Sequence, residues 1–145
     1  MRLTAHTDYG LRVLMTLAVI SDRLVTIEEL ADRHKISRNH LMKVAQTLVG
    51  LGLVESVRGR GGGLRLARDP ATLRIGAVVQ ALETDMGLVA CLGDDASSCV
   101  LSGACRLTAA LKRAMTAFLA ELDHITLRDL ADNRTLLRRR LKAAA

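Results

Sequence analysis

The stretch "TIEELADRHKISRNHLMKVAQTLVGLG", residues 26–52, contains two apolar-periodic segments separated by a tight turn. The first segment begins with Thr26 and Glu29 in the register of a capping box. The second begins with Ser37, a favourable helix cap, and ends before Gly52, as helices commonly do. Two short helices joined in this way predict a helix-turn-helix.

A glycine-rich segment with basic residues follows the second helix. In "LVESVRGRGGGLRLA", we expect strands over residues 53–57 and 64–67, with "RGRGGG" as the hairpin tip. Three consecutive glycines also suit a phosphate-binding loop, but that motif needs a following helix and a Gly-Lys-Ser/Thr ending, and the sequence has neither. The segment therefore predicts the wing of a winged helix-turn-helix.

Positive charge is concentrated on this predicted motif. The formal net charge of the chain is +6, and residues 35–68 contain seven Lys or Arg residues against Glu55 alone. A basic stretch on a groove-reading motif indicates double-stranded DNA as the partner. Base edges are read from the start of the second helix, and wing cations suit the minor groove or flanking phosphates. The predicted DNA contacts are Arg38, Asn39, His40, Lys43 and Gln46 on the helix, with Arg58 and Arg60 at the wing tip.

The second half of the chain has a different character. Residues 73–83 predict a short helix. A long helix is predicted to begin at Ser102, with an apolar stripe in steps of three and four from Leu107 to Ile125. A small winged domain offers little cover for such a stripe, so we expect it to form a two-fold dimer seam. Thr126 and Asp129 indicate a further short helix, and we expect the basic tail "LLRRRLKAAA" to fray.

These elements predict a mainly α fold: a winged helix-turn-helix domain with a small β-hairpin wing, plus a long C-terminal dimerisation helix. We divide the chain into a DNA-binding domain (1–70), a short helix with a cysteine loop (71–106) and a dimerisation helix with its tail (107–145). No apolar run reaches the ~18 residues of a membrane span, and the N-terminus lacks the pattern of a signal peptide. We therefore expect a cytoplasmic protein that does not bind membranes. The sequence shows no nucleophile–base pair that would predict an enzyme.

All three cysteines lie in one polar stretch, "CLGDDASSCVLSGACR", with the spacing Cys91-x7-Cys99-x5-Cys105. Their odd number and a reducing cytoplasm disfavour a disulfide framework. Four interpretations compete: buried small hydrophobic residues, a zinc site, metal-free redox thiols and an iron–sulfur cluster. The polar flanks argue against burial, and the spacing is wider than the pairs of a structural zinc site. Composition alone leaves a redox thiol and a cluster open.

Cys105 has the setting of a reactive thiolate. It is expected near the start of the long helix, with Ser102 as the cap. The positive end of the helix dipole favours an anionic sulfur there, and Arg106 adds a cation.

The sequence also resembles a known family. The N-terminal "MRLTAHTDYGLRVL", "ISRNHLMKV", "VRGRGGGLRLA" and the cysteine loop ending "ACRLTAAL" are similar to the NsrR/IscR family of winged-helix iron–sulfur regulators, and the likeness covers nearly the whole chain. It implies a homodimer that binds palindromic promoter DNA and a cluster held by Cys91, Cys99 and Cys105. For the NsrR branch it implies a cluster, 4Fe–4S in preference to 2Fe–2S, that reacts with nitric oxide and thereby ends repression.

Two positions separate the branches of this family. IscR-type proteins carry a histidine ligand three residues after the last cysteine, where this chain has Thr108. NsrR-type proteins carry an aspartate in the N-terminal helix, supplied by the other subunit, where this chain has Asp8. The resemblance thus implies Asp8 as the fourth ligand, although a carboxylate at a helix start is also a common cap or dipole partner. One departure is the seven-residue spacer after Cys91, which is longer than in many relatives.

A carboxylate among thiolates would explain why the loop has three cysteines. A hard oxygen donor beside soft sulfur donors leaves one easily displaced ligand, which a sensor needs. The alternatives are an IscR-like cluster regulator, a metal-free or zinc-bound cysteine redox regulator and a small iron–sulfur electron-transfer protein. The last of these would need no basic wing.

Overall fold

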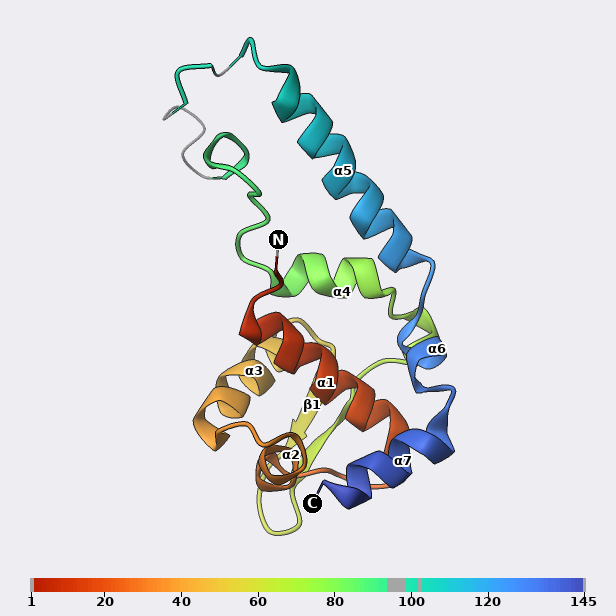
Figure 1. The fold of residues 1–145 in the computed structure, drawn as a ribbon. Helices are drawn as coiled ribbons and strands as arrows, with labels where there is room; N and C mark the ends of the chain where they lie inside the picture. Colours follow the sequence, from red (N-terminus) through yellow and green to blue (C-terminus); the bar gives the residue numbers. More distant parts are fainter. Residues whose placement is uncertain (1, 94–98, 102, 145) are drawn as a thin grey trace.

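The computed structural model describes residues 2–93, 99–101 and 103–144 (Figure 1). The elements, in chain order, are α1 (Ala5–Val19), α2 (Ile27–His34), α3 (Arg38–Gly50), β1 (Val54–Val57), β2 (Gly63–Leu66), the 3-10 turn η1 (Pro70–Thr72), α4 (Ile75–Leu82), the 3-10 turn η2 (Ala90–Leu92), α5 (Arg106–Asp123), α6 (Leu127–Ala131) and α7 (Arg134–Ala143). We call α1 to α3 with the hairpin the winged domain. We call η2 with α5 the arm.

The helix-turn-helix is confirmed, with both expected caps in place. The Thr26 hydroxyl accepts the Glu29 backbone N–H at 3.1 Å, and the Ser37 hydroxyl accepts that of His40 at 3.3 Å. The turn between α2 and α3 passes through Lys35, whose φ of 54° is left-handed. Gly52, one residue beyond the C-cap of α3, has a φ of 65°, so it ends the helix as expected.

The wing is also confirmed. β1 and β2 pair antiparallel, from Val54 opposite Leu66 to Val57 opposite Gly63. Their bounds lie within one residue of the predicted strands. Val25 joins the outer side of β2 through an isolated bridge to Leu64, which ties the wing to the segment before α2.

One apolar core holds the winged domain to α4. Its fully buried side chains come from several elements and include Leu14, Leu17, Leu30, Leu41 and Leu48. α1 crosses α4 closely because residue 10 is glycine: a Cβ there would lie 2.8 Å from Leu82 Cδ1. α1 packs against both α4 and α3, so a shift of α4 would also displace α1 and α3.

α5 rises away from this core (Figure 1). None of the eighteen residues of α5, all of them described, is buried. The helix is shorter than predicted: it begins at Arg106, with Cys105 at the N-cap position, and ends at Asp123. Ser102, the expected cap, lies outside the described residues, and the chain bends back after Asp123 toward the capping box of α6, which Thr126 and Asp129 form as predicted.

The lower end of α5 is locked onto α4. A Cβ at Gly76 would overlap the Leu119 backbone oxygen and lie 2.5 Å from the Asp123 carboxylate. That carboxylate accepts the Ala77 backbone N–H at 2.8 Å, so α5 caps the first turn of α4, whose own N-cap residue, Arg74, makes no side-chain cap. The arm and α4 are thus joined by a close backbone crossing and a shared cap.

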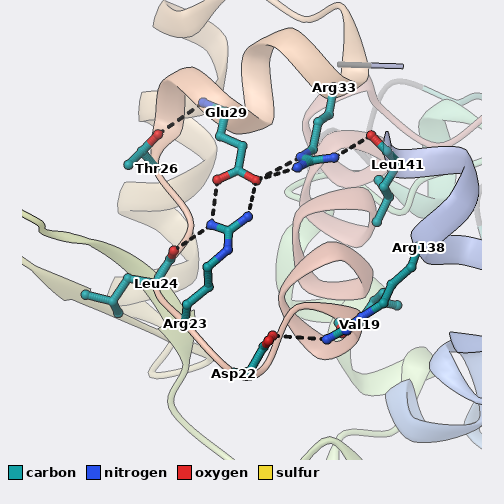
Figure 2. A network of polar contacts seen from close by, with 9 residues as sticks. All are labelled: Val19, Asp22, Arg23, Leu24, Thr26, Glu29, Arg33, Arg138 and Leu141. Carbon is teal, nitrogen blue, oxygen red and sulfur yellow. Dashed lines mark hydrogen bonds and ion pairs between the residues drawn. The ribbon is translucent and has the colours of Figure 1, made fainter. Parts of the chain in front are cut away.

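The C-terminal tail does not fray, so that prediction is wrong. It forms α7 and docks on the winged domain through arginines, as Figure 2 shows. Arg134 and Arg138 donate to the Val19 carbonyl at the end of α1, at 2.9 and 3.2 Å. Arg33 of α2 donates to the Leu141 carbonyl and pairs with Glu29. Terminal helix carbonyls lack intrahelical partners, so these guanidinium groups satisfy them.

Glu29 lies at the centre of the same network. Its carboxylate accepts hydrogen bonds from Arg23 and Arg33. The hydrogen bond from Arg23 is the main cause that lowers the pKa of Glu29 to about 2. The carboxylate is engaged by these two arginines, while the backbone N–H of Glu29 completes the Thr26 cap. In the part of the chain that the structure describes, no helix is long and apolar enough to span a membrane.

Candidate DNA-reading surface and cysteine site

The predicted readers on α3 share its exposed surface. Arg38, Asn39, His40, Lys43 and Gln46 are all exposed. On the other side of the helix, Leu41, Val44 and Leu48 are buried and fix α3 against the core. Burial of one face leaves the other free for a groove of DNA.

Arg38 is held in place by a neighbouring helix. Its guanidinium lies 2.8 Å from the carboxylate of Glu28 on α2, and both side chains are more than half exposed. An exposed pair of this kind contributes little stability, so Arg38 can exchange Glu28 for a stronger acceptor at small cost.

A groove separates α3 from the wing. It has a volume of about 560 Å³, and Met42, Gln46 and Arg58 are among its lining residues. Arg58 and Arg60 are both exposed at the wing. Sequence reasoning missed Met42, although its position four residues after Arg38 places it on the exposed strip of the helix.

The structure brings two of the three cysteines to the first turn of α5. Cys91 Sγ, in η2, lies 3.5 Å from the Thr108 hydroxyl. Cys105 stands at the N-cap, where the backbone N–H groups of Thr108 and Leu107 and then the Thr108 hydroxyl lower its pKa. These groups lie in the first turn of α5, where free backbone N–H groups favour an anionic sulfur.

The donor set suits a thiolate-bound iron cluster. Cys91, Cys99 and Cys105 are free thiols that are neither fully buried nor fully exposed. Cys99 lies between them in the chain, and residues 94–98 of the intervening loop are outside the described part. Within one chain, the described residues contain no group of three His, Cys, Asp or Glu side chains that could hold a metal ion.

Asp8 is not the cap of its helix. Thr4 caps α1 by accepting the Thr7 backbone N–H at 3.3 Å. Asp8 stands in the first turn, and its carboxylate pairs with Arg12 one turn later, at 2.7 and 3.0 Å. The Asp8 side chain is 45% exposed, so a group held by another chain can reach its carboxylate.

A chain of contacts leads from Asp8 to the reading helix. The Arg12 guanidinium lies 6.0 Å from the centre of the Tyr9 ring. The Tyr9 ring lies 6.2 Å from the ring of His40, in the first turn of α3. His6, also on α1, contacts the Thr47 hydroxyl of α3 at 3.1 Å. The helix that carries Asp8 is therefore in direct contact with the helix that carries the readers.

Glu83 is a second connection that sequence reasoning missed. This buried residue ends α4, and its carboxylate accepts the Thr4 backbone N–H at 2.6 Å and the Thr4 hydroxyl at 3.2 Å. It fixes the start of α1 to the point where the chain leaves α4 for the cysteine segment. The two residues are 79 positions apart, so no local sequence signal could have found the contact.

The chain is similar to known proteins over most of its length. The Rrf2 family model, described as an iron-dependent transcriptional regulator, matches residues 3–133. The HTH-type transcriptional regulator NsrR of Bacillus subtilis is 46% identical over 98% of this chain and 98% of its own length. The NsrR of Bacillus licheniformis is 45% identical over 97% of this chain and 99% of its own.

Solved structures show the same fold. CymR, the global cysteine regulator of B. subtilis, superposes with a TM-score of 0.74 at 26% identity, over 92% of this chain and 98% of its own. IscR of T. potens gives a TM-score of 0.73 at 24% identity, over 92% of this chain and 88% of its own, a likeness of fold alone.

Proposed function

The chain belongs to the Rrf2 family of transcriptional regulators, which are not enzymes, and we propose that it is a nitric-oxide-responsive repressor that binds palindromic promoter DNA as a homodimer in the cytoplasm. The observation that carries the proposal is the placement of Cys91 and Cys105 at one end of α5, whose other end is locked onto α4, which packs in turn against α1 of the winged domain. The likeness to the NsrR regulators supports nitric oxide as the signal.

Cys91, Cys99 and Cys105 would hold an iron–sulfur cluster, 4Fe–4S in preference to 2Fe–2S, with Asp8 of a second copy as the fourth ligand. When bound, the cluster supplies iron that reacts with nitric oxide. The residues of the chain position this site: the first turn of α5 stabilises thiolate at Cys105, and Thr108 contacts Cys91. The Asp8 carboxylate, a hard donor among thiolates, would be the ligand most easily displaced.

Dimerisation would cover the exposed apolar surface of α5. Leu107 is 59% exposed, and Phe118 and Leu122 are only partly buried in one chain. Apolar surface of this extent on a projecting helix suits a two-fold interface. Sedimentation tests it: replacing both Phe118 and Leu122 by Glu should give monomers that bind DNA weakly, and an unchanged dimer would place the interface elsewhere.

Loss of the Asp8 bond would reach the reading helix through contacts already in place. Asp8 and Tyr9 are on one helix turn, and the Tyr9 ring lies tilted against the ring of His40, with 6.2 Å between their centres. A bond between Asp8 and a cluster on the arm of another copy would therefore also fix the orientation of α3. The coupling is proposed as a two-state change in which nitric oxide releases this tie and operator affinity falls.

The test of the function is one anaerobic experiment on the purified chain. We expect the visible absorbance of a cluster, an intact mass that includes it, and tight binding to a selected operator. Nitric oxide should change the absorbance and the mass and should abolish tight binding. Arg38→Ala should weaken operator binding by about 1–3 kcal/mol if it reads a base, and Lys43→Ala by a similar amount or through a smaller salt slope. Unaltered binding by both variants would show that α3 is not the reader.

The rival function is a metal-free cysteine redox regulator. It is favoured by the lowered pKa of Cys105 and by the contact of Cys91 with the same helix turn. In that case the anaerobic protein would carry no iron, and a thiol oxidant would change DNA binding while nitric oxide would not. A zinc-bound form would show zinc in the intact mass, and an IscR-like regulator is disfavoured by Thr108 in place of a histidine.

A further inference from the structure

The part of α3 that carries the predicted readers also presents an exposed apolar side chain, that of Met42. Met42 is 42% exposed, and Arg38 and Gln46, four residues before and after it, are exposed polar residues. Residues spaced by four lie above one another on one side of a helix. Arg38, Met42 and Gln46 therefore form one strip on the surface that the reading helix offers to DNA.

Met42 also lines the groove between the reading helix and the wing. The side chains around the groove include the apolar Ile27 and Val49 and, from the wing, Ser56 and Arg58. The apolar part of the groove thus lies between two basic elements, with Arg38 and Lys43 on α3 and Arg58 on the opposite side.

We propose that Met42 contacts the 5-methyl group of a thymine in the major groove and thereby contributes to the choice of operator sequence. This inference rests on the proposed binding of α3 to DNA. Thymine is the base that carries a methyl group on its major-groove edge, and apolar side chains read that group. Methionine suits the contact because its unbranched, polarizable side chain adapts to its surroundings.

The surrounding charge favours this occupant over others. Arg38, Lys43 and Arg58 complement the phosphates that flank a base in the groove. A second copy of the same chain, seated on this strip, would bring its own basic strip against these cations and would be repelled.

The experiment uses operator DNA in which single methyl groups are removed. Duplexes are selected from random DNA with the cluster-loaded wild-type dimer, and each thymine of the selected site is then replaced by deoxyuridine. We expect a loss of affinity of about fourfold at one thymine in each half-site, the change that burial of one methyl group accounts for. The same change at other thymines should be nearly neutral.

Variants assign the effect to Met42. Met42→Ala should bind the thymine operator about fourfold more weakly and should no longer distinguish deoxyuridine. Met42→Leu, which stays apolar at similar volume, should retain the sensitivity. Lys43→Ala is the matched control on the same helix: it should weaken binding and yet keep the full deoxyuridine effect.

The possible outcomes distinguish a failure of this inference from a failure of the proposed function. If the wild-type dimer selects no duplex, the proposed function fails and the inference with it. If it selects an operator but no thymine is sensitive, or if Met42→Ala is as sensitive as the wild type, the role of Met42 alone is overturned.

Discussion

The winged domain and the arm differ in how much of their structure is complete within one chain. In the winged domain, side-chain caps begin each helix and fully buried leucines fix α1, α2 and α3 together. In the arm, Cys91 in η2 and Cys105 at the N-cap of α5 are half-buried, and no residue of α5 is buried. The difference teaches that the packing of the winged domain lies within one chain, whereas the proposed sensor site on the arm would need a second copy and a bound group to be complete.

The largest expected effect is on the free energy of unfolding, when a leucine is replaced by alanine in each of the two regions. Leu41→Ala in α3, where the side chain is 0% exposed, should lower the free energy of unfolding by about 2–5 kcal/mol. Leu107→Ala in α5 should change it by no more than about 0.5 kcal/mol at protein concentrations where the chain is monomeric. Urea unfolding followed by circular dichroism measures both. Equal losses would mean that the arm is packed as tightly as the winged domain.

A smaller effect tests the joint between the regions. Gly76→Ala should lower stability by about 1–3 kcal/mol, because its Cβ would overlap the Leu119 carbonyl and displace α5 from α4. Gly50→Ala is the matched control: no atom lies within 4 Å of its Cβ, and the change should be neutral or stabilise by up to about 1 kcal/mol. Thermal unfolding of the two variants compares them. Similar melting temperatures would show that the crossing is not tight.

The smallest effect lies inside the winged domain, at its turn. Lys35 holds a left-handed φ of 54°, which costs a side-chain-bearing residue about 1–2 kcal/mol. Lys35→Gly should therefore stabilise the chain by up to about 1 kcal/mol, after the greater freedom of glycine in the unfolded state is subtracted. Gly52→Ala, at a φ of 65°, should destabilise it by a similar amount. A loss of stability in Lys35→Gly would show that the lysine side chain makes a contact worth more than the strain.

The winged domain could be predicted because its signals are local. The caps at Thr26 and Ser37 lie three residues from the N–H groups they accept, and the hairpin strands are separated by a short glycine-rich turn. Periodicity therefore placed these elements to within one or two residues.

The arm and its connections could be predicted only in part, because their partners are distant in sequence. The Asp123 cap of α4 spans 46 positions, and the contact of Arg33 with Leu141 spans 108. The predicted helix is longer than the structure shows because the prediction places its cap at Ser102, whereas α5 begins at Arg106 with Cys105 at the N-cap. The docking of α7 was missed because a run of arginines is read as solvated until the carbonyls that they meet are known.

The proposed cross-subunit role of Asp8 would join the two regions, and substitution of Asp8 tests that role most directly. Anaerobic absorbance and operator affinity are measured during titration with nitric oxide for the wild type, Asp8→Ala and Arg12→Ala. Arg12→Ala breaks the same ion pair but keeps the carboxylate, so it controls for loss of that pair. We predict that Asp8→Ala keeps the cluster largely bound but more labile, with shifted absorbance and a weakened response of DNA binding to nitric oxide, while Arg12→Ala keeps the wild-type spectrum. A wild-type spectrum and an unchanged loss of DNA binding in Asp8→Ala would contradict the cross-subunit ligand and leave Asp8 only as the partner of Arg12.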